Sequence, residues 1–85
     1  MRKDIKDNRN MKIGSVDERL NGQTIIYDKL GAKIGEIRPE NNRPVAYDKL
    51  GKRLAYWDEN NDTTWEPNGR KMAKGNVLLG LFFPG

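Results

Sequence analysis

One short motif recurs about every twenty residues along this chain, and its spacing limits the folds that are available. The clearest copies are residues 24–35 (TIIYDKLGAKIG) and 44–55 (PVAYDKLGKRLA), and a looser copy spans residues 63–73. Self-similarity at this period indicates that one small supersecondary unit is reused, because no single copy can bury its apolar face alone. The sequence therefore predicts a repeat fold.

A fourth copy lies in the polar N-terminal stretch. Moving the motif back by one repeat aligns residues 11–16 with residues 32–37, and it places Asp7 at the Asp28 position and Asn10 at the Gly31 position. Asn is the residue other than Gly that best tolerates a positive φ, so this substitution fits a turn. We therefore expect four units, which turn near Asn10, Gly31, Gly51 and Gly69.

Each unit is typical of a β-hairpin, since a short β-rich run leads into a four-residue turn and a second apolar run follows. In residues 28–31 (DKLG) the Asp side chain suits a type I turn, and the Gly suits the left-handed residue of a β-bulge. The hairpin core is expected from residues that repeat on either side of the turn. These are Tyr27, Tyr47 and Trp65 before it, and Ile13, Ile34, Leu54 and Met72 after it.

A small residue follows each apolar position after the turn, at Gly14, Gly35, Ala55 and Ala73. This row predicts that the second strands approach one another closely around a central axis. We therefore expect an all-β protein in which four β-hairpin repeat units pack around a common axis. The single domain covers residues 1–85, with units at approximately 5–20, 22–38, 43–58 and 62–76 and an apolar C-terminal segment at 77–85.

Composition narrows the classes of function. The 85 residues include no Cys and no His, so the chain lacks thiolate metal ligands, disulfides and the commonest general base. We expect a protein that is not an enzyme and that has no metal site, no cofactor and no small-molecule ligand. No apolar run is long enough for a transmembrane helix, and the first residues lack the apolar core of a secretory signal. The expected location is cytoplasmic.

Acidic residues also recur, and they raise an alternative in which they bind a hard cation or act in acid/base chemistry as a small enzyme. Asp28, Asp48 and Glu66 occupy one repeat position and would form an acidic ring if the units converged. Turn capping explains their placement without a ligand. Residues 58–62 (DENND) open like a calcium loop, but Thr63 replaces the required Gly and Gly69 replaces the bidentate Glu.

The C-terminal segment is the most hydrophobic run in the chain, and its large side chains need a cover. Packing on its own domain as a last strand or short helix is the simplest interpretation. Docking to a protein partner or a second copy is the functional interpretation, and membrane contact is a third. We expect partner binding or self-association through Leu78, Leu79, Leu81, Phe82 and Phe83, with Trp57 as a second candidate.

Net charge +4 makes an anionic partner conceivable, although basic and acidic residues alternate along the chain as on an ordinary solvated surface. The aromatic pair Tyr56–Trp57 is a candidate ligand contact, because adjacent strand residues point to opposite faces of a sheet. Nonspecific nucleic-acid binding by basic turns and exposed aromatics is therefore the alternative function. Its candidate residues are Arg38, Arg43, Lys52, Arg53, Arg70 and Lys71.

The pattern aromatic-Asp-x-x-Gly-x-x-apolar-small, followed by residues 69–79 (GRKMAKGNVLL), resembles small bacterial proteins described as 4-fold β-flower proteins. The resemblance extends from about Ile5 to Phe83, and the final copy is its most specific part. It implies a compact all-β arrangement of four hairpin units with no established activity. No functional residue is carried over from it. The residue pattern and the resemblance therefore both favour a structural or interaction module.

Overall fold

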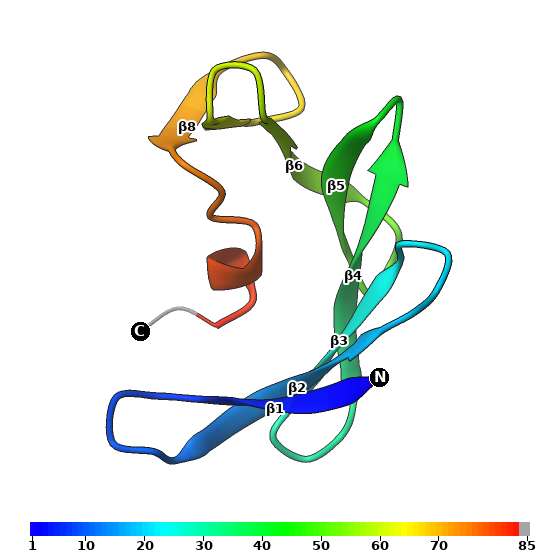
Figure 1. Cartoon of the computed structure of the whole chain (residues 1–85), viewed down its shortest axis with the longest axis vertical. Coiled ribbons are helices and arrows are strands. Elements are labelled where there is room, and N and C mark those ends of the chain that lie inside the picture. The colour runs from blue at the N-terminus through cyan, green and yellow to red at the C-terminus, as the bar shows by residue number, and fades with distance from the viewer. Residues whose placement is uncertain (84–85) are drawn as a thin grey trace.

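The computed structural model describes residues 1–83 and contains one open antiparallel sheet of eight strands (Figure 1). The strand order is β1 to β8, so each strand pairs with the next strand along the chain. The sheet curves, and the 3₁₀ helix η1 (Leu79–Leu81) lies on the inside of the curve. The strands are β1 (Arg2–Lys6), β2 (Lys12–Glu18), β3 (Thr24–Asp28), β4 (Lys33–Glu40), β5 (Arg43–Asp48), β6 (Arg53–Asp58), β7 (Thr63–Trp65) and β8 (Lys71–Lys74).

Three of the four hairpin turns have the expected Asp cap. Asp28 Oδ1 accepts hydrogen bonds from the backbone N–H groups of Leu30 (2.9 Å) and Ala32 (3.0 Å), and Gly31 has a φ of 91°. Asp48 makes the same two bonds in the third hairpin, and Asp7 makes them in the first, where Asn10 has a φ of 65°. The prediction that Asn10 replaces the turn glycine is therefore confirmed.

The fourth turn uses a different side chain. Asn68 Oδ1 accepts the Arg70 N–H at 3.0 Å, while the Glu66 carboxylate lies 3.7 Å from the Arg70 Nε. Glu66 therefore does not cap its turn as Asp28 does. Each of the four hairpins has a shift in strand register beside its turn, which is the β-bulge that the sequence predicts. The bulge changes the direction of the side chains next to the turn.

The strand register separates the residues into two faces, because directly opposed residues point to the same side of a sheet. On the inner face, Ile26 opposes Val16 in β2, Ile37 opposes Ala46, and Ala46 opposes Ala55. Val16, Ile26, Ala46 and Ala55 are each at most 2% exposed. The buried core thus contains Val16, Ile26 and Ala46, which the repeat analysis did not select.

The residues that the repeat analysis did select are less buried, with one exception. Tyr47 is 4% exposed, whereas Ile13, Ile34 and Leu54 are half-buried and Met72 is 36% exposed. Each of these four residues after the turn is the one that the strand register skips, and the extra residue of a bulge has no partner opposite it in the ladder. The predicted hairpin core is therefore only partly correct.

The row of small residues has a different explanation from the one that the sequence suggested. Each second strand pairs with the first strand of the next hairpin, as β4 does with β5. A Cβ on Gly35 would overlap the Phe82 ring and lie 2.6 Å from the Tyr47 carbonyl oxygen, and a Cβ on Gly14 would overlap the Phe83 ring. The two glycines make room for aromatic rings of the C-terminal segment.

Candidate functional site

The C-terminal segment lies against the inner face of its own sheet. Leu78 is 1% exposed and forms one buried cluster with Ala46 and Ala55. Leu81, Phe82 and Trp57 are partly buried and pack against this cluster. Among the predicted contact residues, Phe83 lies over Gly14 and only Leu79 is exposed, at 36%. Residues 84–85 of the predicted segment lie outside the described residues.

Backbone hydrogen bonds hold only the beginning of this segment. The Gly75 N–H donates to the Asp62 carbonyl oxygen (2.6 Å), and the Val77 N–H donates to the Thr64 hydroxyl (3.2 Å). Within the described residues, the bonds of the backbone beyond Val77 are local, such as Phe82 N–H to the Leu79 carbonyl at 3.1 Å. Residues 78–83 are therefore attached to the sheet through their side chains.

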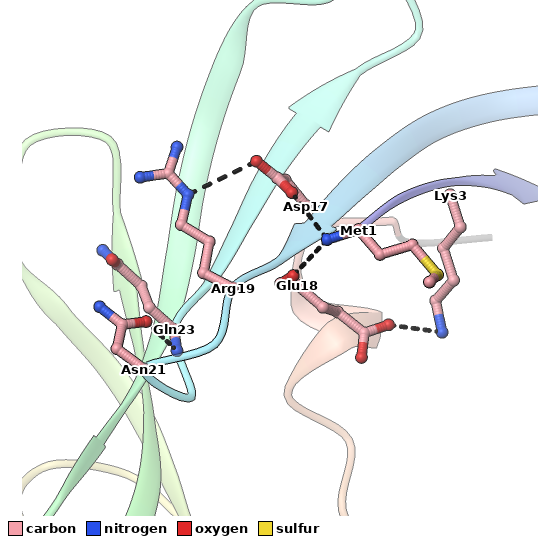
Figure 2. Close-up of polar contacts among 7 residues, drawn as sticks. All are labelled: Met1, Lys3, Asp17, Glu18, Arg19, Asn21 and Gln23. Atoms are coloured by element: carbon pink, nitrogen blue, oxygen red, sulfur yellow. Dashed lines mark hydrogen bonds and ion pairs between the residues drawn. The ribbon is translucent and has the colours of Figure 1, made fainter.

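The first hairpin lies close to the C-terminal segment, and Figure 2 shows the polar contacts that hold its open end. The Lys3 Nζ lies 2.7 Å from the Glu18 Oε1, and the Met1 ammonium group donates to the Glu18 carbonyl oxygen at 2.5 Å. The hydrogen bond and charge of Lys3 lower the pKa of Glu18 from its ordinary value. A cavity of about 300 Å³ lies between this ion pair and the segment, and its lining includes Leu78 and Leu79.

The outer face of the sheet carries tyrosine rings that are covered by arginines. The guanidinium carbon lies 4.1 Å from the ring centre for Arg2 over Tyr27, 4.0 Å for Arg38 over Tyr47 and 4.4 Å for Arg43 over Tyr56. These distances are those of cation–π contacts, which are favourable at partly exposed sites. Two of the three aromatic rings before the turns, Tyr27 and Tyr47, are thus covered on one face by an arginine.

Glu40 is held by two neighbours on this face. Its carboxylate accepts a hydrogen bond from the Tyr47 hydroxyl and one from the Arg53 guanidinium. The Tyr47 hydrogen bond, together with the charge of Arg53, lowers the pKa of Glu40 from its ordinary value. Glu40 therefore stays ionised to lower pH than an isolated glutamate, and it neutralises one guanidinium.

Glu36 has a similar environment earlier in β4. Burial would raise its pKa, but a hydrogen bond from the Gln23 amide (2.6 Å) and the ammonium group of Lys33 (3.4 Å) more than compensate. The net result is a lowered pKa. The outer face thus carries two ionised carboxylates, each with a hydrogen-bond donor and a cation beside it.

A cavity of about 260 Å³ opens beside the Glu40 cluster. It brings together Arg43 and Arg53, which sequence analysis selected as basic candidates, and Tyr56, which it selected as a ligand contact. Sequence analysis missed the contribution of Glu40. The signal was available, since the turn-forming pair at residues 41–42 between two β-rich runs predicts that Glu40 opposes Arg43.

The other basic candidates are dispersed. Arg38 covers Tyr47, Arg70 pairs with Glu66, and Lys52 and Lys71 are exposed near the third and fourth turns. All four candidate arginines are therefore in contact with an aromatic ring or a carboxylate, and the two candidate lysines are exposed.

Tyr56 and Trp57 point to opposite faces, as expected for adjacent strand residues. Tyr56 opposes Trp65 on the outer face, whereas Trp57 opposes Thr64 on the inner face. The Trp57 Nε1–H donates to the Asp62 Oδ1 at 3.0 Å. This bond occupies the only polar group of the indole, and its ring packs against the buried cluster.

The acidic turn residues do not converge. The carboxylates of Asp28 and Asp48 accept backbone N–H groups of their own turns. Within residues 1–83, no group of three acidic residues is arranged to hold a metal ion. None of the helical segments in the same residues has the length and apolarity to cross a membrane.

Comparisons of the chain with known protein families, with characterised proteins and with solved structures found no match. The structure has two candidate functional surfaces. They are the inner face with its C-terminal segment and the outer-face cavity beside Glu40.

Proposed function

We propose that this protein is a non-enzymatic interaction module that self-associates by exchange of its C-terminal apolar segment between copies. In this proposal the four hairpins are arranged around a common axis, as in the β-flower proteins that the sequence resembles, and the segment occupies that axis. The single observation that carries the proposal is the fit of Phe82 and Phe83 over two side-chain-free positions, Gly35 and Gly14.

The inner face supports this proposal because it has the properties of a peptide receptor. It binds a short segment through side chains alone, with Leu78 as the buried anchor and aromatic rings over glycine. Large apolar anchors in a preformed pocket are what gives a short segment affinity. A segment bound in this way is recognised equally well when it comes from a second copy.

The connection to the sheet also supports exchange. Gly75 has a φ of 85°, a conformation that glycine adopts without strain, and it directly follows β8. Residues 75–77 form a short link between the end of β8 and the buried Leu78. Exchange of a terminal element through such a link is a common route to dimers of small proteins.

Capture of an apolar segment from a different protein uses the same face and is the second form of this function. Nonspecific nucleic-acid binding is the alternative from another class, and the exposed Lys52 and Lys71 support it. It has less support than the first, because arginines cover the faces of the outer tyrosines on which bases would stack.

The test is the solution mass of the full chain and of two linker variants, measured by light scattering across a wide range of concentration. Deletion of Asn76 and Val77 shortens the reach of the link by about 7 Å, so that Leu78 no longer reaches its own cluster. We expect this variant to form a folded dimer, because the segment then docks only on a second copy. The full chain is expected to dimerise only at high concentration.

The matched control is a Gly-Ser insertion after Asn76, which leaves docking within one chain possible and is expected to remain monomeric. A folded monomer from the deletion variant at every concentration would contradict exchange. Single-stranded DNA is added in a separate titration, and salt-sensitive binding to it would support the nucleic-acid alternative.

A further inference from the structure

The outer-face cavity has a wall of mixed chemistry. Val45, which is 7% exposed, and Pro67 supply the apolar side chains of the lining, whereas the side chain of Ala55 lies in the inner-face cluster. The polar parts are Glu40, Asn41, Arg43, Arg53 and Tyr56. A volume of about 260 Å³ lies just below the usual lower limit of about 300 Å³ for small-molecule sites, so any occupant is small.

The charges in the cavity do not cancel. Glu40 is engaged by Arg53 and by the Tyr47 hydroxyl. The ion pairs and hydrogen bonds within residues 1–83 include none made by the guanidinium of Arg43, which lies over the Tyr56 ring. The cavity therefore has two guanidinium groups and one carboxylate, and Arg43 supplies the surplus positive charge.

The position of Arg43 is fixed from two sides. Its backbone opposes Glu40 across a tight turn in which Asn41 and Asn42 both have positive φ, at 53° and 63°. Its guanidinium rests on Tyr56, whose strand position is set by pairing with Val45. Cation–π stacking uses the face of the planar guanidinium and leaves its N–H edge free to donate.

We propose that this cavity binds a small carboxylate that carries a planar apolar body. The carboxylate accepts two parallel hydrogen bonds from Arg43, since the guanidinium fork matches its geometry. The apolar body lies against Val45 and Pro67. A phosphate dianion fits less well, because it brings two negative charges to one surplus cation and faces Glu40.

The experiment is a titration of the full chain with benzoate, followed by ¹H–¹⁵N and aromatic NMR. Benzamide is the neutral control of the same shape. We expect saturable benzoate shifts at the Arg43 Nε–H and the Tyr56 ring, and an affinity for benzamide at least about tenfold lower. Affinity for benzoate is also expected to fall as salt is raised.

The substitution Arg43→Gln is expected to weaken benzoate binding by at least about tenfold, because it removes the charged fork. Arg9→Gln is the matched control, since Arg9 is exposed on the first turn, and it is expected to leave the affinity unchanged. N-Acetylphenylalanine provides a second arm. Tighter binding of this compound than of benzoate assigns the site to the carboxyl end of a peptide, whereas the reverse assigns it to a free aromatic acid.

Equal shifts with benzoate and benzamide would overturn the proposal, and this comparison needs no variant. Unsaturated shifts spread over exposed lysines would also overturn it, because they indicate general ion binding. Failure at this cavity is distinct from failure of segment exchange, since the cavity lies on the opposite face of the sheet and is tested without a change in solution mass.

Discussion

Truncation of Leu78 to alanine tests whether the C-terminal segment contributes to the core of its own domain. The side chain is 1% exposed and contacts Ala46 and Ala55, which are too small to fill the resulting cavity. Leu→Ala at such sites costs about 2–5 kcal/mol. A chain of 85 residues has a total stability of about 4–13 kcal/mol, so this one substitution removes a large part of it.

The loss converts into a shift in melting temperature. The unfolding entropy of 85 residues is about 0.18 kcal/mol/K, so a loss of about 3 kcal/mol lowers the Tm by about 17 °C. The assay is thermal unfolding followed by circular dichroism, with calorimetry to check that the transition is two-state.

Leu50→Ala is the matched control, because it makes the same substitution at a side chain that is 87% exposed. It is expected to change stability by less than about 0.5 kcal/mol, which corresponds to less than about 3 °C. Equal Tm values for Leu78→Ala and Leu50→Ala would refute the reasoning, since the segment would then contribute nothing to the folded domain.

Gly35→Ala is expected to cost about 1–3 kcal/mol in urea unfolding, because the added Cβ would overlap the Phe82 ring, and wild-type stability would contradict this contact. Because the folded-state pKa of Glu40 lies below its ordinary value, ionised Glu40 stabilises the fold above that value, and the stabilisation is lost as pH falls towards the lowered pKa. Tm measured against pH should therefore fall on the acid side, and less steeply for Glu40→Gln; identical pH profiles would contradict this role. Asp28→Ala removes the acceptor of two turn N–H groups and is expected to cost about 1 kcal/mol in urea unfolding, whereas Lys29→Ala in the same turn is expected to cost close to nothing.

The turns could be predicted from the sequence because their chemistry is local. A short acidic side chain followed three positions later by Gly or Asn fixes a bulged turn without reference to the rest of the molecule. The role of Asn10 in place of the turn glycine could be predicted for the same reason, and it identifies the first hairpin within a polar stretch.

The faces of the sheet were harder to predict. Alternation along a strand separates residues into two sets, but it does not say which set lies inside when both contain apolar residues. Tyr47 is buried on the outer face beneath Arg38, whereas Ile26 and Ala46 form the inner core. The sequence pattern does not reveal arginine stacking, which buries an aromatic ring without placing it in the apolar core.

The role of the small residues depends on contacts between distant parts of the chain. Gly35 and Phe82 are far apart in the sequence, and no local pattern links them. The sequence identified the C-terminal segment as needing a cover and included its own domain among the candidates. Only the three-dimensional arrangement assigns Phe82 to Gly35 and Phe83 to Gly14.

The most direct test of segment exchange is an isotope-filtered NOE experiment on a concentrated mixture of labelled and unlabelled full-length chains, after unfolding and refolding together. Exchange predicts intermolecular NOEs between the Phe82 ring protons of one chain and the Gly35 Hα protons of another. NOEs that join these groups only within single chains, at every concentration, would contradict the account.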